Sequence, residues 1–147
     1  MTEAENDRRL MLVEIPIRIY GYDIDVMGIV SNQVYVRWFE DLRTEFLARY
    51  WPYEQMLEDN ISPVLARTEV DYKYPLTIHD QVQGSLWVEE FTRAKWIMNF
   101  EIASEKRIFC LGKQMGYVVE LNRKRPVPMP TGLMEKYELA KKKIESA

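Results

Sequence analysis

The chain of 147 residues is 47% hydrophobic and 29% charged with a net charge of −3, which predicts one soluble globular domain over residues 1–147 without nucleic-acid binding. Its single cysteine, Cys110, excludes an intrachain disulfide framework and any metal site built from several thiolates. Glu14 and Pro16 interrupt the first apolar run, so we expect neither a secretion signal nor a membrane-spanning helix, and a cytoplasmic location is the default.

The N-terminal part of the chain predicts a leader, a strand and a turn, in that order. Residues 1–10 are polar and are expected to form a mobile leader, whereas residues 11–20 are apolar and β-branched, as in a strand. Pro16 lacks the N–H that a central strand would donate, so this strand belongs at a sheet edge or at a bulge. Residues 21–30 are then expected to form a turn.

A long amphipathic helix is predicted over residues 32–50. One continuous apolar stripe follows the helical period, and it consists of Tyr35, Trp38, Phe39, Leu42 and Phe46. Ser31 or Asn32 can serve as its N-cap, and Trp51 and Pro52 mark its end. At ~1.5 Å per residue the helix is about 28 Å long, enough to cross a small sheet.

The rest of the chain alternates with the period of strands. After a short helical turn at residues 53–60, four strands are expected, at 64–74, 82–88, 96–102 and 108–121. Residues 122–130 are a proline-rich exit, and Thr131 is expected to cap a closing helix over 132–145. Short turns join antiparallel neighbours, so the fold class is α+β, with a five-stranded antiparallel sheet around the long helix and a C-terminal helix.

Two carboxylates, Asp23 and Asp25, lie just ahead of Gly28 and of the long helix. The free N–H groups and the dipole of a helix N-terminus favour developing negative charge, so a carboxylate beside them is a plausible centre for acyl transfer. Aspartate and glycine are also common turn formers, so the pattern by itself is equally compatible with a purely structural turn.

Other candidate sites have ordinary structural explanations. His79 is the only histidine and falls in a polar turn, where a solvated loop residue is the usual case. Cys110 falls in an apolar strand, as buried filler does. The basic runs at 123–125 and 141–143 are typical of solvated faces, although either could meet a phosphate-bearing ligand.

Two neighbouring strings resemble the signature of the 4-hydroxybenzoyl-CoA thioesterase family of hotdog-fold proteins. They are Tyr22-Asp-x-Asp-x-x-Gly-Ile-Val-x-Asn-x-x-Tyr35 and Arg37-Trp-Phe-Glu-Asp-Leu-Arg43. The resemblance continues through Val70-Asp-Tyr-Lys-Tyr-Pro75, Asp80 and Arg125-Pro-Val-Pro-Met-Pro130, and covers about residues 12–130. It implies a hotdog fold, in which an antiparallel sheet wraps around one long helix.

The resemblance assigns a role to each matching position. Asp25 matches the catalytic carboxylate, and Asn32 matches the residue whose backbone N–H polarises the thioester carbonyl. Gly28 would permit the turn between them, and Asp23 would order the loop rather than react. The acyl group would lie against Val30, Ser31 and Tyr35.

Two further points follow from the same resemblance. Many relatives have histidine where this chain has Ile29, which bears on the subgroup rather than on catalysis. In the turn after the third strand, Arg93 and Lys95 are the candidates for contact with the CoA phosphates.

The resemblance implies a thioester hydrolase that needs no cofactor and acts on an acyl-CoA or acyl-carrier-protein thioester. Asp25 would act as nucleophile or as general base, and the residues do not separate these routes. The family's active site lies between subunits, so a homodimer or homotetramer is expected. The rivals are a hotdog domain that binds such thioesters without hydrolysing them, a hydratase or dehydratase that would depend on His79, and a purely structural oligomer.

Overall fold

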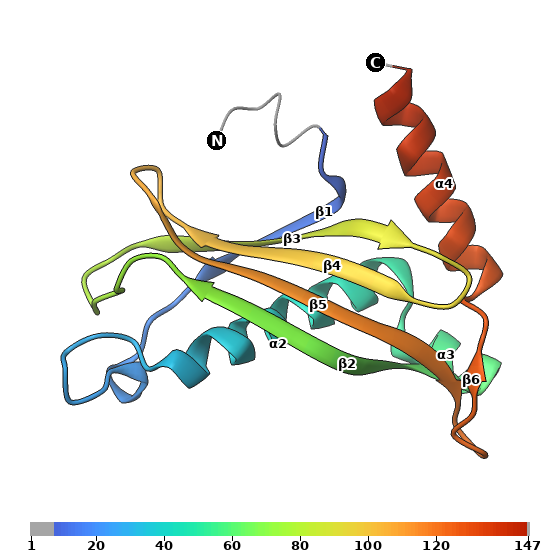
Figure 1. Ribbon diagram of the computed structural model, residues 1–147, viewed down its shortest axis with the longest axis horizontal. Coiled ribbons are helices and arrows are strands. Elements are labelled where there is room, and N and C mark those ends of the chain that lie inside the picture. Colours follow the sequence, from blue (N-terminus) through green and yellow to red (C-terminus); the bar gives the residue numbers. More distant parts are fainter. Residues whose placement is uncertain (1–7, 147) are drawn as a thin grey trace.

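The computed structural model describes residues 8–146 and shows one long helix held against a curled antiparallel sheet (Figure 1). The helical segments are η1 (Gly21–Asp23), α2 (Asn32–Tyr50), α3 (Tyr53–Asp59) and α4 (Thr131–Glu145). The strands are β1 (Leu10–Ile17), β2 (Ile61–Tyr72), β3 (Val82–Phe91), β4 (Trp96–Ala103), β5 (Ile108–Glu120) and β6 (Pro126–Val127). The strand order is β1-β3-β4-β5-β2 with β6 paired to β5, so β1 and β2 are the edges. The predicted α+β hotdog arrangement is confirmed.

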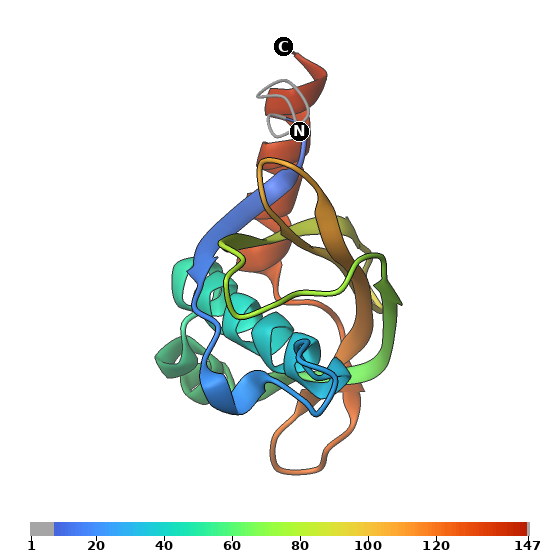
Figure 2. The same cartoon turned by 90° about the vertical axis from the view of Figure 1, so that its left-hand side faces the viewer.

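Helix α2 lies along the concave face of the sheet, which curls around it when seen from the end (Figure 2). Every residue of the predicted apolar stripe is buried, together with Val34. The Phe39 ring stacks on Phe100 with 4.6 Å between ring centroids. A Cβ atom at Gly112 of β5 would overlap the Phe39 ring, so this glycine permits the close approach of helix and sheet.

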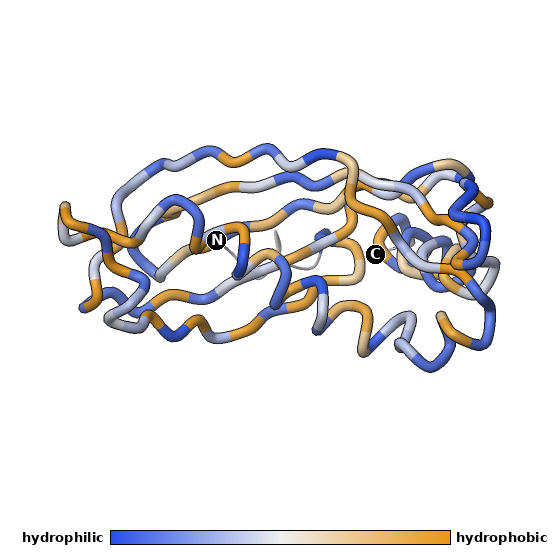
Figure 3. The backbone as a smooth tube through the Cα atoms, turned by 90° about the horizontal axis from the view of Figure 1, so that it is seen from below, coloured by the Kyte–Doolittle hydropathy of each residue, from blue (hydrophilic) through white to orange (hydrophobic). Residues whose placement is uncertain are grey.

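Hydrophobic and hydrophilic residues alternate along the strands, as Figure 3 shows. The alternation in β2 is interrupted by a bulge between Leu65 and Arg67. A regular alternation over residues 64–74 would place Val64 and Ala66 on the face of Thr68, but the extra residue shifts the side-chain parity by one, so Val64 and Thr68 lie on opposite faces. Leu65 instead lies on the row of Gly116, whose vacant side faces the core residue Trp96.

The ends of the elements differ in detail from the prediction. Pro16 lies on an edge strand, as expected. Ser31 occupies the N-cap position of α2, but its side chain makes no capping hydrogen bond. Thr131 is the first residue of α4 rather than its cap, and Pro130 precedes it. The short strand β6 lies in the predicted irregular exit, where three prolines left no periodic signal.

Most of the predicted leader, residues 1–7, lies outside the described residues, and Leu10 belongs to β1. Within the described part of the chain, no helix has the length and apolar character needed to cross a membrane.

Candidate functional site

The segment between β1 and α2 folds back on itself and ends at the start of the helix. Ile24 and Val30 form an isolated antiparallel bridge. On either side of it, Asp25 N–H donates to Ile29 O at 2.9 Å and Ser31 N–H donates to Asp23 O at 2.9 Å. These bonds place both aspartates opposite the three residues that lead into α2.

Gly28 closes this hairpin. Its N–H donates to Asp25 O at 3.0 Å, and its φ is +78°. A Cβ atom there would meet nothing within 4 Å, so the backbone conformation and not space requires glycine. The predicted turn role of Gly28 therefore has a direct geometric basis.

The Asp25 carboxylate is exposed and held by the loop through one oxygen. Its Oδ1 accepts the Met27 N–H at 2.8 Å and, more weakly, the Ile29 N–H at 3.4 Å. Among the described residues, Oδ2 has no hydrogen-bond partner. A carboxylate fixed on one side and open on the other can act as a nucleophile or as a base.

Asn32 is the first residue of α2, so its N–H precedes the first intrahelical hydrogen bond. The Asn32 side chain is exposed, and the backbone carbonyl oxygen of Asn32 accepts a hydrogen bond from the Tyr72 hydroxyl at 3.0 Å. The first helical turn is thereby docked on the end of β2. Free N–H groups and the helix dipole create a partial positive charge next to the Asp25 loop.

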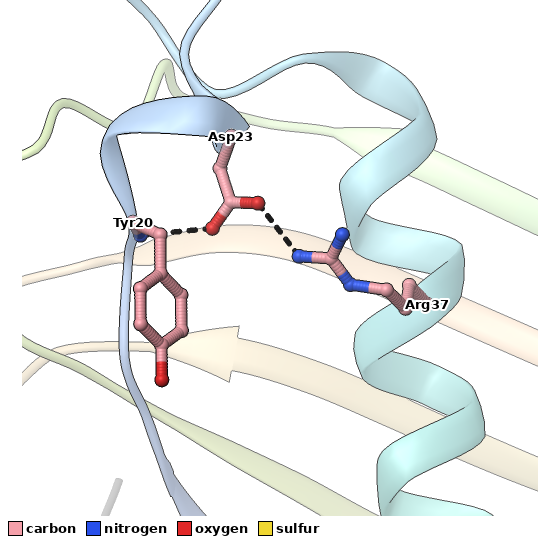
Figure 4. A network of polar contacts seen from close by, with 3 residues as sticks. All are labelled: Tyr20, Asp23 and Arg37. Atoms are coloured by element: carbon pink, nitrogen blue, oxygen red, sulfur yellow. Dashed lines mark hydrogen bonds and ion pairs between the residues drawn. The ribbon is translucent and has the colours of Figure 1, made fainter.

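The side chain of Asp23, two residues before Asp25, is completely buried. Its Oδ2 accepts the Tyr20 N–H at 2.9 Å, and its Oδ1 accepts an N–H of Arg37 at 2.6 Å (Figure 4). The hydrogen bond with Asp23 raises the pKa of Arg37. Both carboxylate oxygens are occupied, which agrees with loop support and leaves neither for chemistry.

The pairing of Asp23 with Arg37 was missed by the sequence reasoning. Arg37 is on the second turn of α2, and its sequence pattern indicated only a face away from the apolar stripe. The two residues are 14 positions apart, across a hairpin, so no periodic signal could join them.

The residues predicted to shape an acyl pocket are close to the helix start, but two of them are buried. Val30 is 2% exposed, and its N–H donates to Leu76 O at 2.8 Å. Tyr35 is 3% exposed and packs edge-on against Trp38 and Tyr72; burial raises the pKa of Tyr35 to about 12. Ser31 is partly exposed. Within this chain, Val30 and Tyr35 pack in the core next to the loop and present little exposed surface to an acyl group.

Arg93 and Lys95 are exposed in the turn between β3 and β4, at the other end of the sheet from Asp25 (Figure 1). Asn32, at the start of α2, contacts Tyr72 at the end of β2. Tyr72 lies opposite Cys110 of β5, which in turn lies opposite Ile102 of β4. From Ile102 to Trp96, next to the turn, β4 advances six residues, or about 20 Å. Within one chain, Arg93 and Lys95 therefore lie far from Asp25.

His79 and Cys110 have the ordinary environments that their sequence contexts predicted. His79 is exposed in the turn between β2 and β3. Cys110 is fully buried, and burial raises the pKa of its thiol to about 12, so it is not a thiolate at neutral pH. Residues 8–146 contain no group of three or more His, Cys, Asp or Glu side chains arranged to hold a metal ion.

Comparison with known proteins identifies the family of this chain. Residues 21–137 match the model of a family described as the Thioesterase-like superfamily. An Aquifex aeolicus (strain VF5) protein with a provisional esterase name is 33% identical over 89 residues, which cover 60% of this chain and 70% of that one. The acyl-CoA thioesterase YbgC of Haemophilus influenzae is 29% identical over 119 residues, covering 78% and 86%.

Solved structures with a similar fold are also found. The Staphylococcus aureus protein SAV2348, solved in complex with CoA, superposes with a TM-score of 0.82 at 12% identity, covering 89% of this chain and 84% of that one. At this identity the superposition establishes the fold alone, whereas the family match extends over most of the chain. The protein therefore belongs to the thioesterase-like superfamily.

Proposed function

We propose that this protein is an acyl-CoA thioesterase that hydrolyses its substrate at the junction of the Asp25 loop with the N-terminus of α2. The observation that carries the proposal is an exposed carboxylate, fixed through one oxygen, on a hairpin that leads directly into a helix start. Family membership and the names of the YbgC relatives support the same reaction class.

In the proposed reaction, Asp25 acts on the carbonyl carbon of the thioester. By one route Oδ2 attacks the carbon, the C–S bond breaks with release of CoA thiolate, and water then hydrolyses the acyl–aspartyl anhydride. By the other route Oδ2 takes a proton from water as that water attacks, and the same C–S bond breaks. Either route yields the free acid and CoA and uses no cofactor, so removal of metal ions with a chelator is expected to leave the rate unchanged.

The negative charge that develops on the carbonyl oxygen would be stabilised by the helix. The Asn32 N–H is the nearest free donor of α2 along the chain, and the helix dipole adds to it. Loss of one such donor commonly lowers kcat by about 10²–10³-fold.

The proposed assembly is a dimer through β2. This edge strand has an unpaired side, and two copies pairing antiparallel there would place one protomer's Asn32 end beside its partner's Arg93 end. Arg93 and Lys95 would then contact the CoA phosphates of the site in the other protomer. The CoA complex of SAV2348 supports CoA as the thiol carrier.

The deciding experiment measures thiol release from benzoyl-CoA, acetyl-CoA, octanoyl-CoA and an acyl-carrier protein. Asp25→Asn is expected to lower kcat/KM by about 10²-fold or more for each substrate that the wild type hydrolyses, because the reacting oxygen loses its charge. The matched control is Glu138→Gln, which neutralises an exposed carboxylate of α4 and is expected to keep the full rate. Calorimetry with CoA checks that Asp25→Asn still binds.

Two results would contradict the proposal. Thiol release that survives Asp25→Asn would remove Asp25 from the mechanism. CoA binding by the wild type without release from any thioester would favour a binding domain over an enzyme. After a single turnover in ¹⁸O-labelled water, label in the Asp25 carboxylate would identify the nucleophilic route, because water must then have attacked the aspartyl carbon of the anhydride.

A further inference from the structure

A groove of about 390 Å³ lies between strand β1 and helix α2, at the edge of the sheet opposite to β2. Ile15, Ile17 and Trp38 form the apolar part of its lining, and two tyrosines, two arginines and one aspartate form the rest. Its volume is within the range of sites that bind small molecules. Aromatic rings and charges of both signs in one groove suit a ligand that has a ring, an anionic group and hydroxyl groups.

Another β-strand is not the ligand that this edge favours. Pro16 lines the groove and has no N–H to donate to a strand ladder. Elsewhere on β1, the Leu12 carbonyl oxygen accepts an N–H of Arg49 at 3.4 Å. β1 is therefore a poor template for strand addition, and a small molecule fits the groove better.

Arg37 gives the groove a cation that is held in place. It reaches from α2 to the η1 loop, where one terminal nitrogen donates to the buried Asp23 carboxylate at 2.6 Å (Figure 4). The Arg37 side chain is nevertheless 49% exposed, and among the described residues its other N–H groups have no acceptor. A guanidinium has five N–H donors in a planar fork, so Arg37 can bind a phosphate while it keeps its bond to Asp23.

The segment that follows β1 contributes a stack of side chains to the same groove. The Arg18 guanidinium carbon lies 4.8 Å from the centre of the Tyr20 ring. The Tyr20 and Tyr22 rings are stacked, with 5.0 Å between centroids and 6° between planes. Tyr22 is 76% exposed, so its ring is open to a further planar group. An exposed aromatic ring held in this way is a platform on which a nucleobase can stack.

Tyr22 and Asp41 both lie close to the Arg37 guanidinium. The pKa of Arg37 is raised first by its hydrogen bond with Asp23 and then, to smaller extents, by Tyr22 and Asp41. Asp41 is about one helical turn after Arg37, and among the described residues it forms no ion pair. Its carboxylate can accept hydrogen bonds from hydroxyl groups, as an acidic residue does from the ribose in dinucleotide sites.

We propose that this groove binds a nucleoside monophosphate, with its base on Tyr22, its phosphate on Arg37 and its ribose hydroxyls at Asp41. The three side chains match the three parts of such a ligand. Inorganic phosphate would leave the aromatic ring and the carboxylate without a partner, and a neutral aromatic compound would leave the guanidinium without one.

This groove is distinct from the contacts proposed for CoA. Those involve Arg93 and Lys95 in the turn between β3 and β4 and a dimer through β2, whereas the groove borders β1 at the other edge. The inference does not rest on thioester hydrolysis. Binding is therefore measured without any thioester, and Asp25→Asn is expected to bind the nucleotide as the wild type does.

Calorimetry with AMP tests the site. Saturable binding to the wild type is expected, and Tyr22→Leu is expected to weaken it about tenfold, because the base loses its stacking partner. The matched control is Tyr53→Leu, which removes a similarly exposed tyrosine of α3 outside the groove and is expected to keep the wild-type affinity. Adenosine and ribose 5-phosphate each lack one part of AMP, and both are expected to bind at least tenfold more weakly than AMP.

Two further measurements test the polar contacts. Arg37→Met, studied well below its Tm, is expected to weaken AMP binding about tenfold or more, because the phosphate loses a charge-assisted hydrogen bond. In the wild type, 2′,3′-dideoxy-AMP, which lacks the ribose hydroxyls, is expected to bind about tenfold more weakly than AMP. In Asp41→Ala the two nucleotides are expected to bind equally, because the acceptor that distinguishes them is gone.

Several results would overturn the inference. They are absence of saturable AMP binding to the wild type, unchanged AMP affinity in both Tyr22→Leu and Arg37→Met, and full discrimination between the two nucleotides in Asp41→Ala. Loss of AMP binding in the double variant Arg93→Gln, Lys95→Gln would place AMP at the contacts proposed for CoA. Weaker CoA binding by Tyr22→Leu would assign the groove to the nucleotide of CoA itself, so that either result would also exclude a separate site.

Discussion

Burial determines the protonation of two side chains near the start of α2. The pKa of the Cys110 thiol is raised from 9.0 to about 12, and that of the Tyr35 hydroxyl is raised from 10.0 to about 12, in both cases chiefly by desolvation. The folded protein thus keeps these protons at pH values where the unfolded chain has released them. The contribution of these two groups to stability is fully present below about pH 9, and it is lost as the pH rises from about 9 to about 12.

Thermal unfolding between pH 8 and pH 11 tests this effect. The Tm of the wild type is expected to fall with rising pH, and the combined variant Cys110→Ala, Tyr35→Phe is expected to show a shallower fall. Its lower Tm at pH 8 is immaterial, because the comparison is between slopes. Equal slopes would show that the alkaline loss of stability has another origin.

At the scale of elements, the central contact is the clamp between the η1 loop and α2. Asp23 takes the Tyr20 N–H and Arg37 with its carboxylate, while its backbone oxygen takes the Ser31 N–H. One buried residue therefore joins the end of β1, the hairpin and the helix. The position of the Asp25 carboxylate relative to the helix N-terminus depends on this contact.

Asp23→Asn and Arg37→Met are expected to lower kcat about tenfold or more with little change in KM, because they displace Asp25 without removing a substrate contact. Each is also expected to destabilise the fold by roughly 1–3 kcal/mol, the range for an unsatisfied buried polar group. Rates are measured well below the Tm of each variant, so that the folded fraction is the same. Arg37→Lys, which keeps the charge but not the planar fork, is expected to recover only part of kcat. Full kcat in folded Asp23→Asn would limit Asp23 to a structural role.

At the scale of the whole molecule, the separation of Asp25 from Arg93 and Lys95 is the decisive feature. About 20 Å of sheet lies between the two ends of one chain, and the proposed dimer would bring Arg93 and Lys95 close to the Asp25 site of the partner subunit. Antiparallel pairing of two β2 edges would supply that arrangement twice per dimer.

Mixed dimers of two variants test whether Arg93 and Lys95 act at the Asp25 site of the partner subunit. Asp25→Asn alone is expected to be inactive, and Arg93→Gln, Lys95→Gln together are expected to raise KM for an acyl-CoA, because they remove two charges that would contact phosphate. When equal amounts of the two variants are unfolded and refolded together, half of the dimers are mixed and one site in each is complete. At low substrate concentration about a quarter of the wild-type activity is then expected. No gain over the separate variants, or an unchanged KM in the double variant, would contradict the proposed contact.

Local sequence patterns were sufficient to predict the main helices and strands of this fold. The bounds of α2 and the burial of its stripe followed from a period of 3.6, and the strands from a period of two, because each period gives a segment one apolar face. The turn at Gly28 also agreed with the structure, since its hydrogen bond to Asp25 joins residues three positions apart. Long-range packing decided the rest: the Asp23–Arg37 pair through which Asp23 supports the loop, the bulge in β2, and the distance from Asp25 to Arg93. These features join residues far apart in the sequence, where no periodicity records which side chains will meet.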